Sequence, residues 1–119
     1  MILPAEDDLT IYRGATYRKR WQWKTGDPSA GVDMTGAAVE MHVRPDVSSK
    51  RIYLIASTDN GRIAFDDAAE GQFSLTLSAA ETELLDFESG VYDLRITMPD
   101  DTVWPLVRGS VELQQRVTR

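Results

Sequence analysis

The stretch AAVEMHVR, residues 37–44, has the clearest alternation of apolar and polar side chains in the chain. Its two alternating sets are Ala37, Val39, Met41 and Val43, and Ala38, Glu40, His42 and Arg44. Side chains of a β-strand point alternately to opposite faces, so a period of two predicts a strand that buries one face. Residues 37–44 therefore indicate a β-protein.

The segment before this strand predicts two further strands and a loop. Residues 9–13 form the first expected strand, which Gly14 ends. Residues 16–24 form the second, with aromatic side chains and Lys19 on one face and mainly charged side chains on the other. Lys19 interrupts the apolar face, so we expect it near a sheet edge with its aliphatic part over an aromatic ring. Residues 25–31 are rich in Gly, Pro, Asp and Ser and predict a loop.

The segment after the central strand predicts a hairpin and four more strands. Residues 51–57 and 62–65 are expected to pair across Asn60-Gly61, because this dipeptide tolerates the positive φ of a tight hairpin turn. The remaining strands are expected at residues 72–77, 91–98, 103–107 and 110–117. Pro105 has no backbone N–H, so its strand is expected at a sheet edge or at a β-bulge.

One short helix is predicted between the strands at 72–77 and 91–98. Ser78 and Glu81 have the spacing of a capping box, in which each side chain bonds the other residue's backbone N–H. The helix is expected to cover residues 79–87, with Leu84, Leu85 and Phe87 packed on the sheet. Gly90 is expected to end this segment.

The 119 residues, of which 42% are hydrophobic, suit one domain with one core. About seven to nine short strands with turns between them and one helix favour a β-sandwich or barrel spanning residues 1–119. Whether residues 1–8 form a flexible arm is left open by the sequence.

The residue types needed for catalysis or metal binding are sparse. The chain has no cysteine, which excludes disulfides, thiolate zinc sites and cysteine nucleophiles. His42, the only histidine, has no nucleophile motif near it and is interpreted as an exposed or edge residue. The acidic pairs 66–67 and 100–101 lack the spacing of a calcium loop and are interpreted as turn residues. We therefore expect no enzyme activity, no metal and no cofactor.

The charge distribution fits either contacts between protein subunits or a solvated surface without a partner. The net charge is −6, and no apolar stretch is long enough to cross a bilayer, so nucleic acid and membrane partners are disfavoured. The N-terminus lacks a signal-peptide pattern, so synthesis without an export signal is expected. Basic residues gather towards the two ends, while residues 59–101 are mostly acidic. Unlike patches can dock between copies. The residues expected to make contacts are Arg13, Arg18, Arg20, Lys24, Arg116 and Arg119.

Several segments together resemble small structural proteins of tailed bacteriophages, including the N-terminal domain of upper baseplate proteins and related tail or fibre-anchoring domains. The matching pieces are Gly14, VDMTG at 32–36, SAAET at 78–82, YDL at 92–94, RGSV at 108–111 and VTR at 117–119. The resemblance implies an immunoglobulin-like β-sandwich, no catalysis and self-assembly within a virion. Upper baseplate proteins continue into a longer region, whereas this chain stops at Arg119.

The expected function is that of a virion structural protein of the tail, baseplate or fibre-attachment apparatus, made in the host cytoplasm. Its partners would be other virion proteins and further copies of itself. A capsid decoration protein is one alternative. A small carbohydrate- or ligand-binding module is another, with Trp104 as the candidate contact because it lies beside Pro105 at an expected edge.

Overall fold

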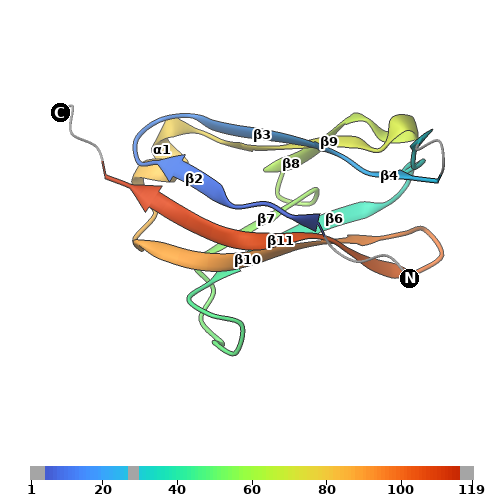
Figure 1. Ribbon diagram of the computed structural model, residues 1–119. Coiled ribbons are helices and arrows are strands. Elements are labelled where there is room, and N and C mark those ends of the chain that lie inside the picture. The colour runs from blue at the N-terminus through green and yellow to red at the C-terminus, as the bar shows by residue number, and fades with distance from the viewer. Residues whose placement is uncertain (1–4, 27–29, 116–119) are drawn as a thin grey trace.

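The computed structural model describes residues 5–26 and 30–115, which are mostly β-strand (Figure 1). Eleven strands lie in this part of the chain, more than the seven to nine expected, because three of them have only two residues. The strands form three sheets. One short α-helix and one 3-10 helix (η1, Ala68–Glu70), which the sequence did not predict, accompany them.

The larger sheet has the order β1-β11-β10-β6-β7, with β2 also paired to β11. Its antiparallel part holds the central strand of the sequence pattern, β6, beside β10 and β7. The N-terminal strands β1 and β2 both run parallel to β11, one after the other. The bounds are β1 Ala5–Glu6, β2 Leu9–Tyr12, β6 Ala38–Arg44, β7 Leu54–Ser57, β10 Ser89–Thr97 and β11 Val103–Gln114.

The smaller sheet has the order β3-β9-β8, all antiparallel. Its strands are β3 Tyr17–Gln22, β9 Gln72–Leu77 and β8 Ile63–Asp67. A two-stranded sheet of β4 Lys24–Thr25 and β5 Ala30–Gly31 extends beyond the end of β3. The smaller sheet lies over the larger one (Figure 1).

The hydrophobic core lies between these two sheets. Val39, Met41 and Val43 are buried while their neighbours on β6 are not, which confirms the predicted alternation. Phe73, Leu75 and Leu77 supply the facing side from β9. Alternate residues on strands of both sheets therefore point inward and join one apolar cluster. The polar alternates form the outer faces.

The hairpin predicted across Asn60-Gly61 was wrong. The turn forms, with Gly61 at φ 79°, but β7 pairs with β6 in the larger sheet and β8 pairs with β9 in the smaller one. Asn60 supplies part of the reason. Its side chain donates to the Ile55 carbonyl (2.9 Å) and accepts from the Ser57 backbone N–H (3.0 Å). The Ile55 carbonyl and the Ser57 N–H are thus bonded by the Asn60 side chain and not by a neighbouring strand. The chain then passes from the larger sheet at β7 to the smaller sheet at β8.

The predicted capping box is present, but the helix is shorter than expected. Ser78 Oγ accepts from the Glu81 N–H (3.1 Å), and the Ser78 N–H donates to the Glu81 carboxylate (3.0 Å). The helix α1 covers only Ala79–Glu83. Leu85 and Phe87 are buried as expected, whereas Leu84 is 82% exposed. Alternate burial at 85 and 87 fits non-helical backbone better than a helix, which would bring residues 84 and 87 to one face.

The C-terminal strand differs from the prediction by being continuous. Residues 103–107 and 110–117 were expected as two strands, but β11 runs from Val103 to Gln114. Gly90, expected to end the helical segment, lies inside β10 opposite Val111. The position predicted for Pro105 is confirmed, since the register of β10 and β11 shifts between Leu94 and Arg95. Leu94 faces Val107 and Arg95 faces Pro105, which leaves Leu106 as the bulged residue.

No helix among the described residues is long and apolar enough to cross a membrane.

Candidate interaction surface

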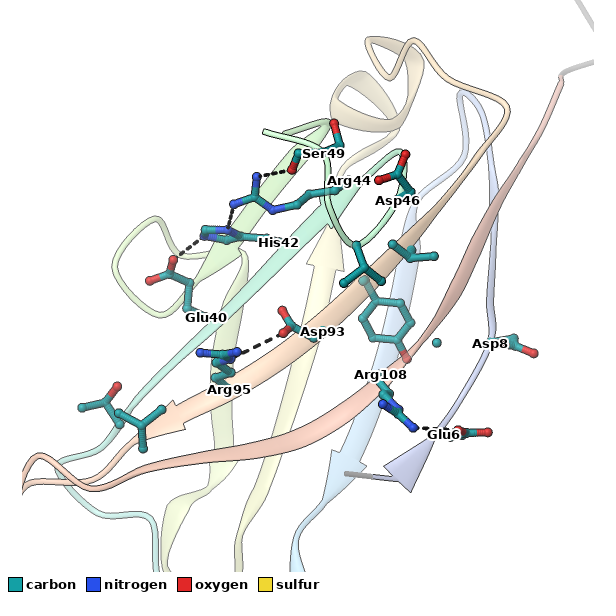
Figure 2. A pocket seen from close by; sticks show the side chains of 16 residues that line it. Glu6, Asp8, Glu40, His42, Arg44, Asp46, Ser49, Asp93, Arg95 and Arg108 are labelled. Atoms are coloured by element: carbon teal, nitrogen blue, oxygen red, sulfur yellow. Dashed lines mark hydrogen bonds and ion pairs between the residues drawn. The ribbon is translucent and has the colours of Figure 1, made fainter. Parts of the chain in front are cut away.

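A groove of about 1260 Å³ lies on the outer face of the larger sheet (Figure 2). It lies there because β6 and β10 point their apolar alternates into the core and their polar alternates outward. The N-terminal segment and the loop after β6 form its sides. The charged residues that line it are Glu6, Asp8, Glu40, Arg44, Asp46, Asp93, Arg95 and Arg108.

One row of polar and charged residues crosses four strands of this face. The strand register places Glu6 opposite Arg108, Arg108 opposite Asp93, and Asp93 opposite His42. Arg108 Nη2 forms an ion pair with the Glu6 carboxylate at 3.3 Å. Asp93 instead forms its ion pair along its own strand, with Arg95 Nε at 3.4 Å. Neighbouring opposite charges on a sheet face attract one another weakly, so these exposed ion pairs contribute little stability.

His42 lies at the centre of a hydrogen-bonded chain on β6 (Figure 2). Its Nε2 bonds the Glu40 carboxylate, and Arg44 Nη2 donates to its Nδ1 at 3.2 Å. Arg44 Nη1 also donates to the Ser49 carbonyl at 3.1 Å. Because Nδ1 accepts, the proton of the neutral ring sits on Nε2. Both ring nitrogens are therefore engaged with neighbours. The residue is half-buried on a strand with neighbours on both sides, so the expected edge or exposed position was wrong.

A second polar cluster lies where the N-terminal segment passes between the sheets. The Tyr92 hydroxyl donates to the Asp7 carbonyl, and the Asp7 carboxylate accepts from Trp21 Nε1 at 3.1 Å. Lys19 Nζ pairs with the same carboxylate oxygen at 3.1 Å. Burial, with a contribution from the charge of Asp7, raises the pKa of Tyr17 to about 12 and raises the pKa of Tyr92 as well. Both phenols therefore stay protonated at neutral pH. Lys19 lies on β3, which is an edge strand of the smaller sheet, as predicted.

The contact residues predicted from the sequence do not line the groove. Arg18, Arg20 and Lys24 are exposed on β3 and β4, where Arg20 Nε pairs with Asp66 at 3.3 Å. Arg13 has a role within the fold, because Nε donates to the Glu83 carbonyl (3.0 Å) and Nη1 to Gln115 (3.1 Å).

The other predicted contacts are a tryptophan and the C-terminal arginines. Trp104 is partly buried and packs against the core. Arg116 and Arg119 lie outside the described residues.

Three groove arginines were not singled out by the sequence pattern as contact residues. Arg44 and Arg95 occupy polar positions of strands that were predicted, and Arg108 follows a predicted strand. Alternation could have placed Arg44 and Arg95 on an outer face. It could not have shown that β6, β10 and β11 are adjacent, which brings these residues together.

The charged side chains that line the groove are mainly acidic. Its five carboxylates exceed its three guanidinium groups by two, and both ring nitrogens of His42 are already hydrogen-bonded. Within residues 5–26 and 30–115, no three His, Asp or Glu side chains gather in a way that could hold a metal ion.

The chain matches no protein-family model and no curated protein sequence.

Proposed function

We propose that this chain is a non-catalytic structural protein of a tailed-bacteriophage virion, in the tail, baseplate or fibre-attachment apparatus. It is made in the host cytoplasm and acts by docking onto other subunits. The proposal combines the resemblance of the sequence segments with the groove on the larger sheet. That groove carries the proposal, because its charged side chains are held by neighbours yet remain accessible. The side chains of Glu6 and Glu40 are 76% and 59% exposed.

We further propose that the fold is an immunoglobulin-like sandwich. Such domains pair their second, fifth and fourth strands in one sheet and their third, sixth and seventh in the other. Omitting the two-residue strands, the order β3-β9-β8 corresponds to the first set and β6-β10-β11 to the second. The strand β7 beside β6 corresponds to the additional strand of variable-type domains. This correspondence of pairing order supports the assignment, and the first strand differs by lying beside the last.

A carbohydrate-binding module is the second candidate, because a partly buried tryptophan lies at the start of β11, the last strand. Trp104 is partly buried next to Val103, which is 49% exposed. An indole ring combines a large apolar surface with a polar N–H, which is why tryptophan is enriched at binding interfaces. Binding of soluble oligosaccharides that is lost in Trp104→Ala would favour this candidate.

Immunogold electron microscopy tests the virion assignment. Antibody to this chain would be applied to purified particles, with particles lacking the protein as the control. Gold at the tail tip, collar or fibre base is the expected result. Gold over the heads would instead identify a capsid decoration protein. Particles without gold, from cells in which the protein is abundant and reachable by the antibody, would overturn the virion assignment.

A further inference from the structure

The outer face of the smaller sheet carries exposed basic side chains. Arg18 and Arg20 project from β3, and their cross-strand partners on β9 are the small residues Thr76 and Ser74. Arg20 reaches over Ser74 to Asp66, which also accepts a hydrogen bond from the Ser74 hydroxyl at 3.2 Å. Arg18 has no ion pair or side-chain hydrogen bond within the described part of the chain. Asp66 and Asp67 lie on β8 at the other edge of the sheet, so the β3 edge of this face, which carries Arg18 and Arg20, is its positive part.

The groove of the larger sheet has the opposite character. It is a hollow in which carboxylates outnumber guanidinium groups by two. Each sheet turns its apolar side chains towards the shared core, so these two outer faces lie on opposite sides of the domain (Figure 1). One molecule therefore presents an acidic hollow on one side and projecting arginines on the other.

We propose that the groove of one copy binds the Arg18–Arg20 face of a second copy. The inference rests on the proposed function and names its docking partner. The guanidinium groups of Arg18 and Arg20 would enter the hollow near Glu6 and Glu40. Each of these two glutamates is more exposed than the residue with which it forms an ion pair. Complementary potentials of this kind favour encounter and fix register. An acidic hollow disfavours nucleic acid, because phosphates would meet like charge.

The opposite placement of the two faces determines the kind of assembly. An interface between two different surfaces of the same chain leaves one of each surface free at the ends of a dimer. Further copies can then add in the same orientation, so the interface produces rings if the rotation closes and rows if it does not. A symmetric dimer that uses the same face twice is not expected from this pairing.

Sedimentation velocity of the purified full-length chain tests the inference at increasing protein concentration. We expect reversible association at low ionic strength. It should weaken as the salt concentration rises from about 0.01 M to about 1 M, because the Debye length falls from about 30 Å to about 3 Å. A chain that stays monomeric at all concentrations in low salt would overturn the inference.

Charge-reversal variants identify the surfaces. The double variants Arg18→Glu/Arg20→Glu and Glu6→Lys/Glu40→Lys should each weaken association by at least about tenfold. An equimolar mixture of the two should associate again, because the acidic face of one now meets the basic groove of the other. Lys50→Glu/Arg51→Glu is the matched control, since it makes the same charge change as the first variant at residues that do not line the groove.

Two outcomes contradict the pairing of these faces. One is association that falls no further in the face variants than in the control. The other is a mixture that remains monomeric although both variants keep the circular dichroism and unfolding midpoint of the parent chain. Gold labelling of virions together with a monomeric purified chain would retain the proposed function and reject only this docking mode.

Discussion

The hydroxyl of Tyr92 donates a hydrogen bond to the backbone carbonyl of Asp7, 85 positions earlier in the chain. Asp7 also donates its own N–H to the Arg108 carbonyl at 3.0 Å, and its carboxylate accepts from Trp21 of the smaller sheet. One residue between β1 and β2 therefore contacts β10, β11 and β3. This junction holds the N-terminal segment beside the last strand and connects the two sheets.

Removing the Tyr92 hydroxyl should destabilise the fold measurably. In Tyr92→Phe, the Asp7 carbonyl loses a donor in a largely buried setting, which costs about 1–2 kcal/mol of unfolding free energy. Urea denaturation measures the change. Tyr12→Phe is the matched control, because Tyr12 is 61% exposed, and it should change stability by less than about 0.5 kcal/mol. Equal effects in the two variants would show that the Asp7 bond contributes nothing.

Gly109 should not tolerate a side chain. A Cβ at this position would lie 2.2 Å from the Asp7 carbonyl oxygen, so the N-terminal segment would have to move. We expect Gly109→Ala to lose about 1–3 kcal/mol or more in a thermal or urea unfolding experiment. Substituting Tyr92→Phe in that background should cost less than in the parent chain, because its acceptor has been displaced.

Gly61→Ala is the comparison for that variant. Gly61 has φ 79°, and a methyl group added there would have no atom within 4 Å, so only backbone strain of about 1 kcal/mol is expected. Additive effects of Gly109→Ala and Tyr92→Phe would contradict the close approach to Asp7.

Adjacent leucines after α1 should differ sharply in their contribution to stability. Leu85 is 7% exposed within the core cluster, so Leu85→Ala should cost about 2–5 kcal/mol. Leu84 is largely exposed, and Leu84→Ala should change stability by less than about 0.5 kcal/mol. Chemical denaturation of both variants measures the difference. Similar losses would indicate that the segment after Glu83 is helical after all.

Glu81 should make part of the stability dependent on pH. The hydrogen bond from the Ser78 backbone, followed by that from Arg62, lowers the pKa of Glu81 below its ordinary value of 4.5. A lowered pKa in the folded state contributes stability above the ordinary value, and this contribution is lost as the pH falls through the folded pKa. Glu81→Gln should therefore lose less stability than the parent chain between about pH 5 and about pH 3.

Glu88→Gln is the control for the pH experiment, since it removes an exposed carboxylate. Unfolding midpoints at each pH give the comparison. Parallel curves for the parent chain and Glu81→Gln would contradict the proposed role of the capping box in acid stability.

Tyr17 should govern part of the stability at high pH. Burial, together with the charge of Asp7, raises its pKa to about 12. A raised pKa in the folded state means that stability is fully present below the ordinary value of 10 and is lost as the pH rises towards about 12. Tyr17→Phe should lose less stability than the parent chain over this range, as followed by tryptophan fluorescence. Equal losses would contradict the burial of this phenol.

Local patterns predicted most elements because their causes are local. The alternation in residues 37–44 predicted a strand with its buried face, and Ser78 and Glu81 predicted a helix start. Pro105 marked an irregular strand for lack of an N–H, and the bulge lies beside it. The end of the helix was missed because Leu85 and Phe87 reach the core from extended backbone, and the core decides that geometry.

The pairing of strands was not available from local pattern. Asn60-Gly61 predicts a tight turn wherever it occurs, but whether the flanking strands pair depends on which sheet buries each of them. The groove could not be predicted from local pattern for the same reason. Arg44, Asp93 and Arg108 are separated widely in sequence, and only the adjacency of β6, β10 and β11 brings them together.

The amino-acid sequence by itself determined that the chain is mostly β, where most strands lie and which side chains each strand buries, because a period of two acts within a few residues. The tertiary structure alone decided the partners of each strand, the acidic groove and the position of Asp7 between the sheets. These features depend on contacts between distant segments, whose arrangement is set by burying all the apolar faces at once.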